Sequence, residues 1–189
     1  MKKNVFPALA LALALILPAA LAGCGKSAAP SEPEPAPEGE AGFVSMANPW
    51  TETDSPEAAA EGAGVGYFTV PEEGFMTSAG PVSWEVFPCM KGLAQANGHV
   101  GATELVMRKG LRQDGEDVSG DYSEYKYAWT QTVGGTEVRC FGNTEGKTER
   151  ALWLSDNFSY SFLVRDLDDE SASVGLDADA TAALVGATE

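Results

Sequence analysis

Two cysteines lie far apart in the chain, at Cys89 and Cys140, and a third stands near its start at Cys24. If Cys24 is modified, the other two form an even pair, which in an exported domain suggests a disulfide. A bridge closing about 50 residues would stabilise the fold by roughly 4 kcal/mol in the chain-entropy description. The alternative is two buried thiols that act as small apolar side chains. A redox-active pair is disfavoured because the Cys-x-x-Cys spacing is absent.

Residues that could bind a metal or transfer a proton are few or unspecific. His99 is the only histidine, and no serine or cysteine motif supplies a partner for it, so we expect a surface histidine. The acidic runs 114–121 and 166–170 contain carboxylates of the kind that bind calcium, but neither has the residue order of an EF-hand. We therefore expect solvated acidic loops, without a metal site or a cofactor.

Tyrosines near two carboxylates are the remaining candidates for ligand recognition. Tyr122, Tyr125 and Tyr127 follow Asp117 and Asp121. Such a group could receive a cationic ligand or a sugar. We favour the alternative that these tyrosines belong to the core or to one face of a sheet.

The first 23 residues have the pattern of an export signal. Lys2 and Lys3 precede an apolar run that continues to Ala22, and the run ends in Leu21-Ala-Gly-Cys24. These last four residues resemble the lipobox of bacterial lipoproteins. The resemblance implies cleavage between Gly23 and Cys24, with diacylglycerol attached to the Cys24 thiol. Residues 1–23 would then be a lipoprotein signal peptide, the alternative being an ordinary signal peptide with Cys24 as an incidental thiol.

Residues 24–47 are rich in proline and glutamate and contain almost no residue that could enter a core. This composition predicts an extended tether that, at ~3.1 Å per residue, would hold the domain on the order of 60 Å from the bilayer. A tether of that length suits a thick wall, so we expect a Gram-positive cell surface. Lipid on Cys24 would anchor the chain to the outer face of the membrane, because no second apolar run is long enough to span it.

The charge balance restricts the possible partners. The chain has 12 Lys and Arg against 28 Asp and Glu, and its net charge is −16. Nucleic acid is disfavoured as a partner because phosphate binding needs basic clusters. A cationic partner or substrate is allowed.

Residues 48–189 are long enough for one domain with its own core. Ser55-Pro56-Glu57 predicts the start of a helix that ends at Gly62 or Gly64. A short strand is expected over 65–70, another over 102–109, and a weak helical pattern covers 177–185.

The second half of the domain predicts two β-hairpins. Residues 124–133 alternate between aromatic and polar side chains and end at Gly134-Gly135, a turn that places Val138 opposite Gln131 and Cys140 opposite Trp129. A second turn at Asp156-Asn157 would set Trp153 against Tyr160. The strands form an antiparallel meander with one aromatic face, and its other face also carries apolar side chains that the helix at Ser55 could cover. We predict an α+β fold, an antiparallel sheet with this helix, and a possible C-terminal helix, packed on one face.

Several short motifs, in their order along the chain, resemble domains of unknown function in clostridial-type surface lipoproteins. They are Asn48-Pro-Trp-Thr51, Met107-Arg-Lys109, residues 117–125, Ala151-Leu-Trp153 and Phe158-Ser-Tyr-Ser161. The resemblance supports the fold and the location, and it implies no established activity.

The function expected from the sequence is therefore a non-enzymatic surface module that binds a ligand or a partner protein outside the cell. The first alternative is an enzyme that acts on glycans through paired carboxylates. The second is a lipid-handling module that holds an acyl chain between its aromatic face and a helix.

Overall fold

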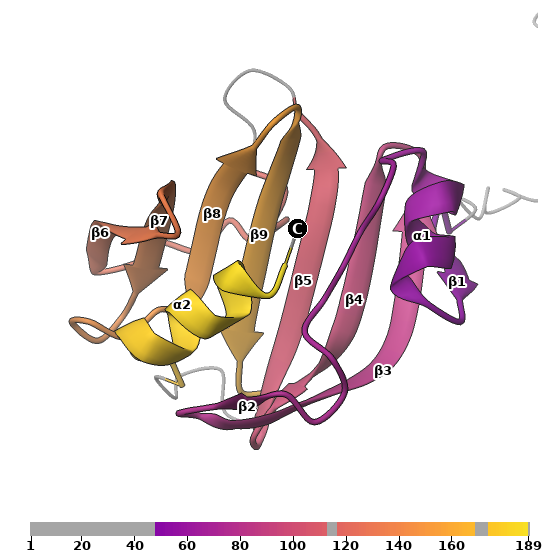
Figure 1. Cartoon of the computed structure of the whole chain (residues 1–189). Coiled ribbons are helices and arrows are strands. Elements are labelled where there is room, and N and C mark those ends of the chain that lie inside the picture. The colour runs from indigo at the N-terminus through magenta and orange to yellow at the C-terminus, as the bar shows by residue number, and fades with distance from the viewer. Residues whose placement is uncertain (1–47, 113–116, 169–173, 189) are drawn as a thin grey trace, which may run out of the picture. The chain divides into compact units, whose positions relative to one another are not determined.

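The computed structural model describes residues 48–112, 117–168 and 174–188. Its helices and strands are β1 (Thr51–Thr53), α1 (Pro56–Ala63), β2 (Met76–Thr77), β3 (Gly80–Met90), β4 (Leu93–Val100), β5 (Thr103–Leu111), β6 (Tyr127–Val133), β7 (Thr136–Gly142), β8 (Arg150–Ser155), β9 (Phe158–Arg165) and α2 (Ala178–Gly186). The strands form an antiparallel sheet in the order β1-β3-β4-β5-β9-β8-β7-β6, and β2 pairs with the start of β3 (Figure 1). An antiparallel sheet with two helices confirms the α+β class.

Both predicted hairpins are present with the predicted register. Gly134 and Gly135 have positive φ values, so β6 and β7 are joined by the two-residue turn that pairs Gln131 with Val138 and Trp129 with Cys140. In the second hairpin Trp153 pairs with Tyr160, and their rings stack with centroids 5.4 Å apart.

The start and end of α1 follow from capping residues. The Ser55 side chain accepts a hydrogen bond from the Ala58 backbone N–H, and Pro56 occupies the first turn. Gly64 ends the helix in the left-handed conformation. In α2 the Asp177 side chain caps Ala180 and also accepts a hydrogen bond from the Ser78 hydroxyl, which joins α2 to the turn before β3.

The main core lies between the sheet and the helices. Inward-facing residues of the strands pack with small side chains of α1 and with Ala180, Leu184 and Val185 of α2. The α1 helix packs on β3 and β4, and α2 contacts β2 and β6. In the view of Figure 1, α2 passes in front of β8 and β9.

The prediction of a strand over residues 65–70 is wrong. This segment crosses in front of the sheet on its way from α1 to β2 without joining it (Figure 1). Val65 and Phe68 are completely buried, so the apolar residues that suggested a strand fill the core instead. The Nζ of Lys109, a buried residue of β5, donates a hydrogen bond to the Tyr67 carbonyl and lies 4.0 Å from the centroid of the Phe158 ring. Burial lowers the pKa of this lysine.

The disulfide prediction is also wrong, because Cys89 and Cys140 are both free, buried thiols. Cys89 lies on β3 and Cys140 on β7, and five inter-strand spacings of about 4.8 Å separate these strands along the sheet. A disulfide needs Cα atoms less than about 7 Å apart. Both thiols face the core, as in the alternative interpretation of the pair, and burial raises the pKa of Cys140.

Candidate functional site

The candidate site lies on the outer face of the sheet, opposite the main core. Ala151 and Phe162 point into the core, so their neighbours Arg150 and Leu163 point outward, and both pair across the sheet. The apolar residues of this face were expected to lie under the helix at Ser55. Residues 117–126 cover part of them instead: the Tyr125 ring packs on Phe141 at a centroid distance of 6.1 Å.

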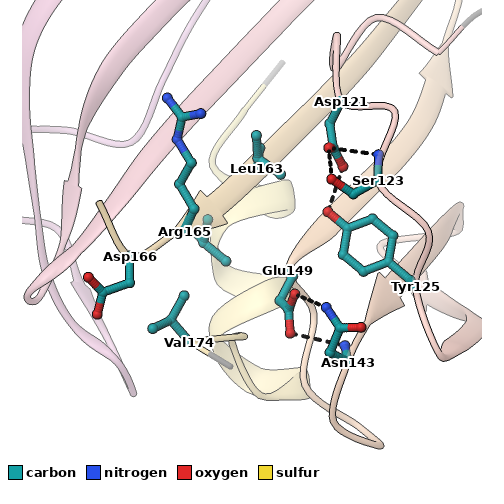
Figure 2. Close-up of a pocket in the computed structure, with 10 residues that line it drawn as sticks. Asp121, Ser123, Tyr125, Asn143, Glu149, Leu163, Arg165, Asp166 and Val174 are labelled. Carbon is teal, nitrogen blue, oxygen red and sulfur yellow. Dashed lines mark hydrogen bonds between the residues drawn. The ribbon is translucent and has the colours of Figure 1, made fainter. Parts of the chain in front are cut away.

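Asp121 organises the covering segment. Its Oδ1 accepts hydrogen bonds from the Ser123 backbone N–H (3.1 Å) and hydroxyl (2.6 Å). Its Oδ2 accepts one from the Tyr125 hydroxyl at 2.6 Å (Figure 2). Burial alone would raise the pKa of Asp121, but these hydrogen bonds and the charge of Arg150 hold it below the usual 3.8. Burial and the bond to Asp121 raise the pKa of Tyr125, so at neutral pH a carboxylate faces a protonated phenol.

Arg150 holds this segment against the sheet. Its side chain is only 11% exposed, and its Nη1 lies 3.1 Å from Asp117 Oδ2 and 3.5 Å from Asp121 Oδ2. Nη1 also donates a hydrogen bond to the Asp121 carbonyl at 2.6 Å. The guanidinium stacks over the rings of Tyr125 and Phe141, at 5.0 and 4.4 Å from their centroids. One side chain thus combines two ion pairs with two cation–π contacts.

The opposite wall of the site comes from the loop between β7 and β8. Glu149 is 8% exposed, and its two carboxylate oxygens accept hydrogen bonds from the Asn143 backbone N–H (3.0 Å) and side-chain amide (2.8 Å). Both bonds are visible in Figure 2. They fix the Glu149 carboxylate relative to the backbone of the loop, so this wall has a defined conformation.

A cavity of about 310 Å³ lies between these walls, with the end of β9 and the residues after it as its remaining sides. Three carboxylates and one guanidinium are among its lining residues, which are Asp121, Ser123, Tyr125, Asn143, Glu149, Leu163, Val164, Arg165, Asp166 and Val174. The guanidinium of Arg165 bonds to Glu104 on β5. With three carboxylates against one guanidinium, the formal charge of the lining is negative. The lining also contains hydroxyl and amide groups.

The structure separates the tyrosines that the sequence grouped. Asp121 and Tyr125 line the cavity, whereas Tyr122 is 96% exposed and lies with Asp117 beside a second hollow of about 480 Å³ next to Arg108. Tyr127 is exposed on β6. Arg150, Asn143 and Glu149 were missed, because no local pattern distinguishes them from other surface residues.

The other predicted residues lie away from this cavity or outside the described part. His99 is on β4, with its Nδ1 3.3 Å from Glu85 Oε1. Gly23, Cys24, Asp114 and residues 169–170 of the second acidic run lie outside the described residues. Within residues 48–112, 117–168 and 174–188, no three His, Cys, Asp or Glu side chains are grouped so that they could hold a metal ion.

Comparison with known proteins gives no information about function. No protein-family model, curated protein or solved structure matches the chain. In the part of the chain that the structure describes, no helix is long and apolar enough to cross a membrane.

Proposed function

We propose that the chain is a membrane-anchored extracytoplasmic lipoprotein whose domain, residues 48–189, binds a small cationic ligand. Lipid on Cys24 would hold it to the membrane, and residues 24–47 would present the domain outward, on the surface of a Gram-positive cell. Both helices packed on one face would leave the opposite face of the sheet for recognition. The lipobox-like residues and the composition of the tether support the anchor, and the resemblance to clostridial-type surface lipoproteins agrees with it.

The anchor predicts incorporation of fatty acid at one position. A bacterial host that expresses the chain and is fed an alkyne-labelled palmitate should place the label on the wild-type chain and not on Cys24→Ser. The unlabelled variant should keep residues 1–23 and migrate as the larger, uncleaved precursor, because in this pathway cleavage follows attachment of the lipid. Equal labelling of both chains, or a wild-type chain that is secreted without label, would contradict the anchor.

The observation that carries the binding proposal is the negatively charged cavity with pre-oriented walls. Asp121 is held by Ser123, Tyr125 and Arg150, and Glu149 is held by Asn143, so these carboxylates lose little freedom when a ligand arrives. A net negative lining within a strongly acidic chain attracts cations over a distance of about one Debye length. Its volume suits a ligand of a few heavy atoms that carries an ammonium group.

Two observations count against the alternatives. A glycosidase general acid needs a carboxyl whose pKa is raised, whereas the pKa of Asp121, one of the three carboxyls of this cavity, is lowered, so Asp121 does not suit that role. A lipid-handling module needs open apolar space between the sheet and a helix. Phe68, Leu105, Met107, Phe162 and Leu184 are completely buried there and occupy that space. Binding without catalysis is therefore the better-supported function.

A diamine tests the proposal, with a neutral molecule of the same shape as the comparison. We expect isothermal titration at low ionic strength to detect 1,4-diaminobutane bound to the domain, and 1,4-butanediol to give no heat of binding. Asp166→Asn removes one negative charge from the lining and should weaken the affinity for the diamine by a factor of about 10 to 100, because a charge-assisted contact is worth about 1.5–3 kcal/mol.

Asp168→Asn is the matched control, because it removes the same charge two residues away on an exposed side chain outside the cavity. Equal weakening by both variants would mean that the diamine follows the overall charge of the domain, and the cavity would then not be its site. If the domain binds the neutral diol as tightly as the diamine, the positive charge of the ligand is not what the cavity recognises, and the proposal of a cationic ligand is wrong.

A further inference from the structure

The two edges of the sheet differ in how well they are protected against pairing with a strand of another molecule. One edge is β1, which has only three residues with Glu52 in the middle. The other is β6, which has seven residues, Tyr127–Val133, without a charge, proline or glycine. Its register with β7 is continuous, so no bulge interrupts it. Natural sheets usually protect an edge by shortness, charge, proline or a bulge, and only β1 has such a feature.

The two-residue turn between β6 and β7 determines which backbone groups of β6 point away from the sheet. A two-residue hairpin turn makes Val133 and Thr136 a hydrogen-bonded pair, so the backbone groups of every second residue back to Tyr127 bond to β7. The N–H and C=O groups of Ala128, Thr130 and Thr132 therefore point away from the sheet. Among the described residues, no strand lies beyond β6 to receive them. The side chains of these three residues are small and exposed.

We propose that β6 is a self-association surface and pairs antiparallel with β6 of a second copy of this chain. A twofold axis at Thr130 would place Thr130 opposite its own copy and Ala128 opposite Thr132. Each of these pairs can exchange two backbone hydrogen bonds, so all six outward groups are satisfied at once. The result is an isologous interface that continues the sheet from one copy into the other.

The composition of the strand favours a second copy as the occupant. The same seven residues lie on both sides of the axis, so no charged side chain faces another within the new ladder. The net charge of −16 on each chain opposes association and is screened by salt. One strand pair buries less than the ~1,600 Å² of a standard stable interface, so we expect a weak dimer that strengthens as ionic strength rises.

Cysteine cross-linking tests the register of this pairing. The sample is the chain without residues 1–23 and with Cys24→Ala, in which Cys89 and Cys140 are buried and give little background. Thr130→Cys should form an intermolecular disulfide under mild oxidation, because its two copies would be about 5.5 Å apart between Cα atoms. Thr132→Cys should not, because its copies would be displaced by four residues, about 13 Å along the strands.

Two further samples complete the experiment. A mixture of Ala128→Cys and Thr132→Cys chains should cross-link between the two variants and not within either of them. Thr130→Pro removes an outward N–H that β7 does not use, so it should abolish the concentration-dependent dimer in sedimentation while the thermal unfolding midpoint changes little. Cross-linking of Thr132→Cys as fast as Thr130→Cys, or a wild-type chain that stays monomeric at the highest soluble concentration and high salt, would overturn the proposal. If β6 instead pairs with a strand of a different protein, the isolated wild-type chain would stay monomeric.

Discussion

Replacement of Arg150 by methionine is expected to lower the free energy of unfolding by about 3–5 kcal/mol, the usual cost of leaving a buried charge without its partner. The guanidinium is 11% exposed and pairs with Asp117 and Asp121, and the Asp121 side chain is itself 12% exposed. Methionine keeps much of the apolar contact with Tyr125 and Phe141 but no positive charge. Urea denaturation of both chains, followed by circular dichroism, measures the difference.

The matched control is Arg139→Met. Arg139 also stacks over the Phe141 ring, at 5.4 Å from its centroid, but it is exposed on β7. Its loss should change the free energy of unfolding by less than about 0.5 kcal/mol, as is usual for exposed positions. A comparable loss for both variants would mean that Arg150 contributes through ring stacking or strand propensity rather than through its ion pairs.

The effect of Arg150→Met should depend on pH in a defined direction. The folded pKa of Asp121 lies below its usual 3.8, and Arg150 is one of the causes. A lowered carboxyl pKa stabilises the fold above 3.8, and this contribution is lost as the pH falls through the folded pKa. The difference between wild type and Arg150→Met should therefore shrink as the pH falls below about 3.8. A difference that is constant from pH 7 to pH 3 would exclude the ion pair as its source.

Phe68→Ala is expected to lower the free energy of unfolding by about 3–5 kcal/mol, the range for large-to-small changes at fully buried aromatic positions. Phe68 is 0% exposed although its backbone belongs to no strand or helix. Its ring fills space between the sheet and the segment that crosses it. The cost combines lost burial of the ring with the cavity left behind, because neighbouring strands are held by their own hydrogen bonds and cannot fully collapse.

Tyr67→Ala is the control for Phe68→Ala. The Tyr67 side chain is 62% exposed, and the bond from Lys109 to residue 67 uses the backbone carbonyl, which alanine retains. We expect a change of less than about 0.5 kcal/mol in chemical denaturation. A small effect of both substitutions would mean that the crossing segment is not part of the cooperative core, and hydrogen exchange of its amides would then be fast.

The elements predicted correctly from the sequence are those whose signal is local. Gly134-Gly135 allows the positive φ values of a two-residue turn, and alternation on both sides then sets the register of β6 and β7. Ser55 and Gly64 mark the ends of α1 because a cap involves only neighbouring backbone groups. These features depend on residues within a few positions of one another, so they can be read without knowledge of the fold.

The long strands β3 and β4 were not predicted, and the reason is their composition. β3 contains Pro81 and Pro88, which argue against a central strand, and β4 (Leu93–Val100) has little aromatic or β-branched content. In the folded chain Pro88 pairs with the short edge strand β1, and Pro81 pairs with β2. The small residues Ala94 and Ala96 of β4 face the core where α1 packs closely. Only the tertiary neighbours make these residues suitable for a sheet.

The sequence alone therefore determined the hairpins, the capped helix, the acidic charge and the expectation of an anchored, tethered domain. The tertiary structure decided that Cys89 and Cys140 stay apart, that Phe68 enters the core, and that Arg150 meets Asp121. The physical reason is that strand order and the side on which each side chain emerges come from many weak long-range contacts acting together. The cavity beside Asp121 has walls from three separate parts of the chain, and nothing within any one of them indicates the other two.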